Sequence, residues 1–160
     1  MSELKDLRLK DQLFMRTYKW RRIDPVPWAP LEKPLAESRL GIVSSAGLSA
    51  PGQEPFNTKA KGGDPSFREI TVDIEVAELV ENHRSQSWDH RGVGLDKNLG
   101  FPIARGRELV ASGRVGSLAD RHLSVMGSIT APGRFVRDTL PRIGDIFVQQ
   151  EVDVALLVPV

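Results

Sequence analysis

The sequence predicts an α/β fold, with a mainly parallel sheet that has helices on both faces in a Rossmann-like, three-layer arrangement. Short apolar segments typical of β-strands alternate along the chain with segments of helical periodicity, as in βαβ units. The last apolar segment, Val154–Val160, contains no charged residue and is typical of a strand buried on both faces of a parallel sheet. At 160 residues, the chain is long enough to form one domain with a substantial core.

Residues 1–30 are predicted to form an amino-terminal helix and a proline-rich connector that precede an α/β domain at residues 31–160. Apolar residues recur at loosely helical spacing among charges between residues 4 and 20. Residues 24–30, Asp-Pro-Val-Pro-Trp-Ala-Pro, cannot continue a helix, because proline lacks a backbone N–H and its ring clashes with the preceding turn. We therefore expect an extended connector after the helix.

Two strands separated by a long loop are predicted next. Residues 38–44 form an apolar segment that breaks into small residues and glycine, so the first strand is expected to end near Ser44. Residues 49–66 are rich in glycine and proline and have no periodicity, which predicts a loop of a length that is usually functional or disordered. Residues 67–73 alternate apolar and polar side chains and are predicted to form the second strand.

The middle of the chain alternates between helical and polar segments. A helical stretch is predicted at residues 76–82, and a polar, glycine-containing segment follows at residues 87–98. Phe101-Pro-Ile is expected to open a helix that Gly113 ends, since proline is tolerated at a helix start and glycine is common just past a helix end.

The last third is predicted to contain a short helical turn at residues 118–122 and a strand at residues 123–126. A further helix follows, kinked by Pro141, with one apolar face formed by four residues at helical spacing: Val136, Leu140, Ile143 and Phe147. The final strand is expected to begin directly after this helix, from Val152.

Composition excludes several classes of protein. Lys and Arg total 22 against 21 Asp and Glu, a net charge of +1, so no overall field favours nucleic acid or an acidic membrane surface. No stretch is long and apolar enough for a membrane span, and nothing at the amino terminus resembles a secretory signal, so we expect a cytoplasmic protein. Cysteine is absent, which excludes disulfides and a cysteine nucleophile within these residues.

Common motifs are missing as well. The loop at residues 47–52 lacks the spacing G-x-G-x-x-G, and the chain contains no phosphate-binding G-x-x-x-x-G-K-[ST], no G-x-S-x-G and no H-E-x-x-H. The three histidines do not have metal-ligand spacing, and no thiolate is available. We therefore expect neither a metal nor a cofactor.

The densest group of chemically active side chains is Asp89-His90-Arg91 together with Asp96. A histidine flanked by carboxylates can act as a general acid near neutral pH, and an adjacent arginine can clamp a carboxylate with two hydrogen bonds. Equally, Asp89 and Asp96 can cap turns while His90 bonds to backbone groups. The residues alone leave these two interpretations open.

Three other residues are weaker candidates. His83 and His122 are expected to be surface or hydrogen-bonded structural histidines. Arg68, just after the glycine-rich loop, can bind an anion or pair with Glu69 and Asp73, and the ion pair is the favoured interpretation.

Several segments occur in an order that resembles a known family. They are Ser45-Ala-Gly-Leu48, Gly63-Asp-Pro-Ser-Phe-Arg-Glu-Ile70, Trp88-Asp-His90, Asp96-x-Asn98, Phe101-Pro-Ile103, Gly113-Arg-Val-Gly116, Met126-Gly127 and Val152-Asp-x-Ala-Leu-Leu-Val-Pro-Val160. Together they are similar to the selenoprotein B subunit of glycine, sarcosine, betaine and D-proline reductases and its shorter relatives. The resemblance spans roughly residues 38–160.

The resemblance implies a function and a position for the nucleophile. In that family a strand that ends like Leu-Val-Pro-Val is followed at once by selenocysteine or cysteine, so the nucleophile is expected immediately after Val160. It implies the substrate-binding and redox component of a reductase that cleaves C–N bonds of small amino acids or amines, working with partner reductase subunits. The chain as given is then expected to be truncated and inactive, and a UGA codon read as a stop would explain its end.

Within that interpretation, His90 and Arg91 are expected to anchor the substrate or donate a proton, with Asp89 and Asp96 orienting them. The loop from Ser45 to Gly47 is expected to line the pocket, with Arg68 as a further binding residue. The alternative is a non-catalytic binding or scaffold module that ends naturally at Val160. Because an open apolar strand edge templates pairing, we also expect a homo-oligomer.

Overall fold

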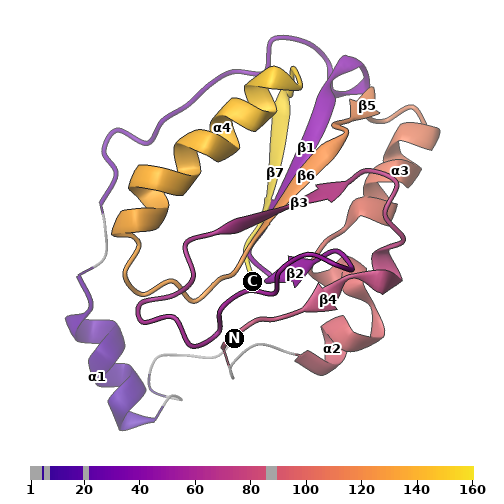
Figure 1. Ribbon diagram of the computed structural model, residues 1–160. Coiled ribbons are helices and arrows are strands. Elements are labelled where there is room, and N and C mark those ends of the chain that lie inside the picture. Colours follow the sequence, from indigo (N-terminus) through magenta and orange to yellow (C-terminus); the bar gives the residue numbers. More distant parts are fainter. Residues whose placement is uncertain (1–4, 6–7, 20–21, 86–89) are drawn as a thin grey trace. The chain divides into compact units, whose positions relative to one another are not determined.

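The structure, a computed structural model, describes residues 5, 8–19, 22–85 and 90–160 (Figure 1). It divides into two compact units, residues 1–30 and residues 31–160. In the described residues of the first unit lies the helix α1 (Leu9–Thr17), which is shorter than the helix predicted between residues 4 and 20. Arg8 and Tyr18, at its two ends, both have extended backbone conformations and so limit the helix to two and a half turns.

The second unit is built around β1 (Arg39–Ser44), the central strand of a five-stranded sheet. On one side, β1 pairs in parallel with β7 (Val154–Val158) along almost its whole length. On the other side it pairs in parallel first with β5 (Ser117–Leu118) and then with β6 (Arg121–Val125). The α/β class is thus confirmed, with mostly parallel strands.

One edge of the sheet differs from the prediction. The strand β3 (Phe67–Thr71) pairs with β6 in the antiparallel direction, so the sheet is mixed. The long loop at residues 50–66 leads into this edge strand. Parallel pairing would instead require a crossover connection, usually a helix. The Rossmann-like, three-layer description therefore stays a prediction.

The helix α3 (Ile103–Ala111) covers one face of the sheet and α4 (Leu140–Gln149) the other (Figure 1). On the α3 face, Ile42 of β1 belongs to the same buried cluster as Phe101 and Ile103. A chain turn with Gly113 at φ +71° ends α3, as predicted from that glycine.

On the α4 face, Ile143 and Phe147 pack against Leu123 and Val125 of β6. A Cβ at Gly41 of β1 would lie only 2.8 Å from the tip of the Phe147 ring, so glycine lets α4 approach the sheet closely. The predicted apolar face is confirmed only in its second half, because Ile143 and Phe147 are buried whereas Leu140 is 42% exposed. The first turn of this helix, Phe135–Thr139, is a wider π-helical turn (η5) that precedes Pro141.

Two local predictions are wrong because strand pairing overrides local propensity. Residues 76–82 form only a 3₁₀ turn, η3 (Val76–Glu78), followed by β4 (Val80–Glu81), which pairs with β2 (Leu48–Ser49) in a second, antiparallel sheet. Residues 118–122 form no helical turn, because they join the end of β5 to the start of β6.

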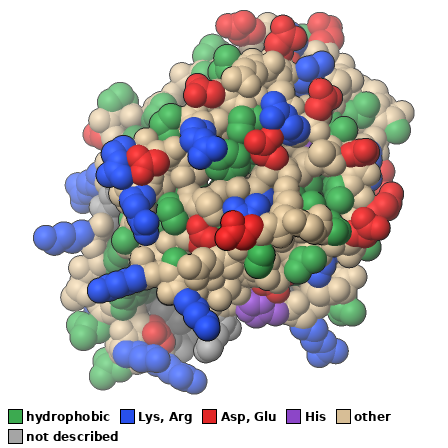
Figure 2. Space-filling view, viewed as in Figure 1, with side chains coloured by type: hydrophobic (Ala, Val, Ile, Leu, Met, Phe, Trp, Pro, Cys, Tyr) green, Lys and Arg blue, Asp and Glu red, His purple; other side chains and the backbone are tan. Residues whose placement is uncertain are grey.

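The polar segment predicted at residues 87–98 contains the short helix α2 (His90–Leu95) and the 3₁₀ turn η4 (Lys97–Leu99). A further 3₁₀ turn, η2 (Leu35–Glu37), leads into β1. None of the helices in the described part of the chain is long and apolar enough to cross a bilayer. Acidic and basic side chains lie close together over the middle of the face drawn in Figure 2.

The apolar strand at the carboxyl end is placed as predicted, but it is not buried on both faces. Leu156 is 41% exposed and Leu157 68% exposed, and the only strand that pairs with β7 in the described part of the chain is β1. The reason is that β7 lies at the edge of the sheet, where apolar composition alone does not guarantee cover from neighbouring elements.

Candidate functional site

The carboxyl ends of β1, β6 and β7 meet at one edge of the sheet, because the three strands are parallel. Ser45, the first residue after β1, joins all three. Its backbone N–H donates to the carbonyl of Val158 (3.0 Å), and its own carbonyl accepts from the N–H of Gly127 (2.7 Å). Its hydroxyl oxygen accepts from the N–H of Val160 (2.8 Å), so Val160 is held in the loop that follows β1.

The space above Gly127 is occupied from three sides. A Cβ placed on Gly127 would lie 2.7 Å from His83 Nε2, 2.9 Å from the carbonyl oxygen of Ser45 and 3.2 Å from that of Val160. The first two distances are shorter than any normal contact, so no side chain fits there without displacing these groups. The strand ends therefore bring His83 and Val160 around one small residue. We refer to Ser45, His83, Gly127 and Val160 together as the strand-end site.

The pairing of β2 with β4 brings His83 to this place. The N–H of Asn82 donates to the carbonyl of Gly47 (2.9 Å), and Gly47 adopts φ +66°, with its Cα facing the backbone of His83. The carboxylate of Glu81 accepts the backbone N–H of His83 (2.7 Å). The residues just after β4 are thus held against the loop after β1 by the Asn82–Gly47 bond, and the Glu81 carboxylate fixes the backbone of His83 locally.

The hydrogen bonds of His83 define its tautomer. The N–H of Ser85 donates to His83 Nδ1 (3.2 Å), so a neutral ring carries its proton on Nε2, the nitrogen nearest Gly127. Burial lowers the pKa of His83 from its usual 6.5, against the opposing charge of Glu81 and with a smaller contribution from His90. The ring is accordingly neutral at pH 7, with an N–H donor at the strand ends.

His90, the central residue of the predicted cluster, is linked to His83 through the carboxylate of Glu81. Its Nδ1 is 2.9 Å from a carboxylate oxygen of Glu81, and its Nε2 is 2.8 Å from the carbonyl oxygen of Ser85. Both partners are acceptors, so only the imidazolium, with a proton on each nitrogen, donates to both. The His83 and His90 rings are 6.5 Å apart between centroids, with Glu81 bonded to both residues.

The structure places the other predicted cluster residues differently. Asp96 caps the turn η4, where its carboxylate accepts from the N–H of Asn98 (2.9 Å), and these bonds lower its pKa. Arg91 is exposed on α2. Asp89 lies outside the described residues. Of the described cluster residues, His90 is therefore connected to the strand-end site through Glu81, which is bonded to both His90 and His83. Asp96 is bonded only locally, within the turn that it caps.

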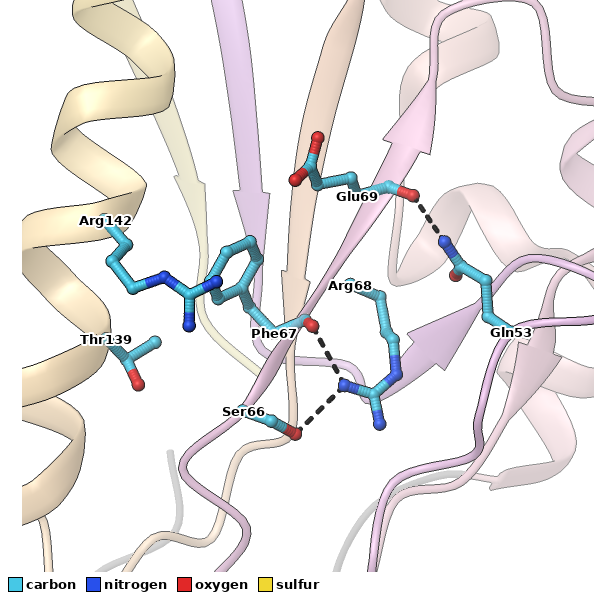
Figure 3. Close-up of a pocket in the computed structure, with 7 residues that line it drawn as sticks. All are labelled: Gln53, Ser66, Phe67, Arg68, Glu69, Thr139 and Arg142. Atoms are coloured by element: carbon cyan, nitrogen blue, oxygen red, sulfur yellow. Dashed lines mark hydrogen bonds between the residues drawn. The ribbon is translucent and has the colours of Figure 1, made fainter.

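Arg68 lines a different cavity, of about 300 Å³, between β3 and the start of α4 (Figure 3). Its guanidinium donates to the carbonyls of Glu54, Pro55 and Phe67 and to the hydroxyl of Ser66, and it stacks 4.3 Å over the Phe56 ring. These bonds fasten the 50–66 loop to β3.

The expected ion pair of Arg68 with Glu69 is replaced by another. Glu69 pairs with Arg121 of β6 at 2.6 Å. In Figure 3, Arg142 lies beside the ring of Phe67, and its guanidinium carbon is 5.0 Å from the ring centroid. Two arginines, Arg68 and Arg142, therefore line the cavity. The guanidinium of Arg68 already donates to four acceptors.

An apolar groove of about 230 Å³ lies directly beside the strand ends, between β7 and the first turn of α4. Ser45 is its polar member, and the rest of its lining is apolar: Val43, Val125, Phe135, Leu140, Leu157, Val158 and Pro159. Among the described residues, no group of three His, Asp or Glu side chains is arranged to hold a metal ion.

His83 and Glu81 were missed by sequence reasoning, which weighed His83 as a structural or surface residue. The residue is 7% exposed and hydrogen-bonded, but it also reaches the strand ends. The sequence signal for the position of His83 is Gly47, because glycine readily adopts the positive φ that lets the chain turn sharply after β1 and lead into β2, the partner of β4.

Comparison with known proteins gives one informative relative. The chain is 32% identical, over 136 residues, to D-proline reductase subunit gamma of Acetoanaerobium sticklandii. The match covers 84% of this chain and 54% of the relative, so the chain spans about half the length of the protein it matches. No family model matches the chain. No solved structure matches it significantly. The similarity to a D-proline reductase subunit agrees with the resemblance that the ordered segments of the sequence indicate.

Proposed function

We propose that this chain, as a relative of D-proline reductase subunit gamma, forms the substrate-binding and redox component of a selenocysteine- or cysteine-dependent reductase. The reaction class is reductive cleavage of a C–N bond in a small amino acid or amine. The observation that carries the proposal is the bond from the Val160 N–H to the hydroxyl of Ser45, because it fixes the end of β7 at the edge where parallel sheets hold reactive groups.

The redox residue is proposed to follow Val160 directly. A selenolate or thiolate there attacks the carbon that bears the amine, forming a Se–C or S–C bond as the C–N bond breaks. The electron pair of the C–N bond leaves with nitrogen, which takes up a proton. A thiolate of a partner subunit then attacks the selenium or sulfur and forms an Se–S or S–S bond, while the electron pair of the C–Se or C–S bond goes to carbon, which takes up a proton and leaves as the reduced product. A second thiol of the partner cleaves the new bond, which releases the nucleophile and leaves the partner's two thiols oxidised to a disulfide. Residues 1–160 contain no cysteine and are proposed to be inactive alone.

The groove beside Ser45 supports a small substrate with an apolar body. Its volume, about 230 Å³, suits a ring the size of proline, and its lining is almost entirely carbon. We propose Arg91 and the loop from Ser45 to Gly47 as substrate-binding groups, with His90 and Asp96 as the cluster that supports them. Arg68 is the least supported of the predicted binding residues, because its guanidinium is occupied by the loop it fastens.

The native gene provides the first test. We expect the codon after Val160 to be UGA or a cysteine codon, followed by an open frame that encodes more chain. A different stop codon would contradict the proposal and favour the scaffold module that ends at Val160.

The protein encoded by the whole gene provides the second test. With its partner subunits and a dithiol, it is expected to reduce D-proline or a related cyclic or N-methylated amino acid, measured as the opened or demethylated amine product. Replacing the residue after Val160 by serine should abolish turnover. Equal turnover in the serine variant would exclude a redox role at this position.

We also propose that the chain self-associates through the open edge of β7. The exposed Leu156 and Leu157 lie on a strand without any charged residue, and such edges readily pair with another chain. Light scattering on residues 1–160 is expected to give a dimer or larger species. A monomer at high micromolar concentration would contradict this.

A further inference from the structure

The position of His83 adds a role that the proposed function does not assign. His83 Nε2 and the carbonyl oxygens of Ser45 and Val160 all lie within 3.2 Å of the single point above Gly127. A residue that follows Val160 starts from this carbonyl. The backbone of such a residue therefore begins at a carbonyl that borders the same point as His83 Nε2.

The hydrogen bonding of His83 decides what this nitrogen can do. Its Nδ1 accepts the N–H of Ser85, so the neutral ring is a donor at Nε2 and has no free lone pair there. A general base is thereby excluded for the neutral ring, whereas an anion can be bound. Burial lowers the pKa of His83, which favours this neutral donor at physiological pH.

The surrounding charges agree with a neutral donor. Among the described residues, Glu81 of β4 and His90 of α2 are the titratable groups whose charges act on His83. They pair with each other at 2.9 Å, and the backbone N–H of His83 is bonded to the same carboxylate. When His90 is protonated, its charge is therefore paired with that of Glu81, whose carboxylate also accepts the backbone N–H of His83.

We propose that His83 donates a hydrogen bond from Nε2 to the anionic selenium or sulfur of the residue that follows Val160, and so stabilises this nucleophile as an anion. The inference rests on the proposed function for the identity of that residue. The role is hydrogen-bond donation to an anion without proton transfer, and it differs from the acid or anchoring role expected for His90. A side-chain amide at position 83 should be able to replace it, and an apolar ring should not.

The test uses the absence of cysteine from the chain. A Cys-Gly-Gly extension after Val160 gives a protein with a single thiol, whose alkylation rate by iodoacetamide is measured from pH 5 to pH 10. With His83 in place, the midpoint is expected about one unit below the ordinary cysteine value of about 8.5. His83→Phe should return it to about 8.5, which is roughly tenfold less thiolate at pH 7, while His83→Gln should stay close to the parent.

Controls separate the effect of the His83 hydrogen bond on the thiol midpoint from the effect of a change in net charge and from loss of folding. Lys59→Gln removes an exposed positive charge on the 50–66 loop and should leave the midpoint unchanged. An unchanged midpoint in folded His83→Phe, a Gln variant that shifts as much as the Phe variant, or a shift in the lysine control would each overturn the inference.

A measurement without substitution covers the case in which His83→Phe does not fold. The Nε2 resonance of His83, followed by ¹⁵N NMR in the extended protein, should move with the same midpoint as the thiol, and a resonance that does not move overturns the inference. Failure of the proposed function is distinguishable, because the whole-gene protein would then lack reductase activity while the thiol midpoint still depended on residue 83.

Discussion

His83 and His122 lie in two buried regions that share one chemistry and differ in surroundings. In each ring Nδ1 accepts a backbone N–H, from Ser85 (3.2 Å) and Ile42 (3.0 Å) respectively, so each neutral ring carries its proton on Nε2. Burial lowers the pKa of both. Tautomer and burial alone therefore do not distinguish a histidine of the core from one at a candidate site.

The difference lies in what surrounds Nε2. His122 is fully buried within β6, and its ring meets that of Phe101 edge-on at 6.3 Å, so it is enclosed by the sheet and its cover. His83 lies at the strand-end site, beside Gly127 and Val160. One histidine thus fills the interior, and the other reaches the edge where chain continuation and substrate are proposed to meet.

Replacing each histidine by alanine, one at a time, is expected to produce the largest difference in stability between the two regions. His122→Ala is expected to lower the free energy of unfolding by about 4 kcal/mol, because it leaves a cavity and an unpaired N–H on Ile42. His83→Ala, at the edge of the domain, should cost about half as much. Urea denaturation measures both. Equal losses would show that the His83 region is as much a part of the core as the His122 region.

The second largest expected effect is the dependence of the free energy of unfolding on pH. The pKa of His122 is about 4 in the folded protein, mainly because of burial, against 6.5 in the unfolded chain. Between these values the unfolded chain binds a proton that the folded protein does not, so stability is full above pH 6.5 and falls as the pH drops toward 4. The expected loss is about 3 kcal/mol.

A variant separates the two histidines in this titration. His122→Gln should flatten most of the slope between pH 6.5 and 4, and the slope that remains belongs to His83, whose pKa is lowered in the same direction. Asp64 has a pKa below its usual 3.8, so its loss appears only at lower pH. Unfolding free energies at half-unit pH steps measure this. An unaltered slope in His122→Gln would contradict the assignment.

A methyl group at the strand-end site should have a smaller effect. Gly127→Ala places a Cβ 2.7 Å from His83 Nε2, and the expected cost is about 2 kcal/mol, with a shift of the His83 ring resonances. Gly144→Ala is the matched control, because no atom lies within 4 Å of its Cβ and the residue is inside α4. It should stabilise the protein by about 0.5–1 kcal/mol. The same sign for both variants would contradict the crowding above Gly127.

The smallest expected effect concerns the bond that holds Val160. Ser45→Ala removes the acceptor for the Val160 N–H and should cost about 1 kcal/mol, together with faster hydrogen exchange at the end of β7. Ser112→Ala removes an exposed bond to the carbonyl of Leu109 and should change stability by less than about 0.5 kcal/mol. Unchanged exchange at Val160 in the Ser45 variant would show that β7 is held without this bond.

Apolar patterns in the sequence were sufficient for the elements that form the large sheet and its cover. The strands β1, β3 and β7 and the helix α4 were predicted from apolar patterns that continue over five or more residues, and α3 from its start and stop signals. For β6 only the second half was predicted. The two-residue strands β2 and β4 were not, since so short a segment has no period and forms only through its distant partner.

The candidate site was only partly accessible to sequence analysis. The loop from Ser45 to Gly47 was expected to line a pocket because of the family resemblance, and in the structure Ser45 lies at the carboxyl ends of the parallel strands, although its role in binding stays a prediction. His83 reaches the site only through the pairing of β2 with β4, which the sequence does not reveal. The exposed face of β7 was missed for a related reason, because apolar composition does not say which neighbours cover a strand.

The pairing of β1 with β7 also determines the order in which the domain can be completed during synthesis. The hydrogen bond between Arg39 and Asp153, at the start of this pair, joins residues 114 positions apart. At ribosomal rates of about 5–20 residues per second, the partner strand of β1 is synthesised roughly 6–23 s after β1 itself. Until then one edge of β1 lacks its partner strand, so pairing with another chain competes with completion of the sheet.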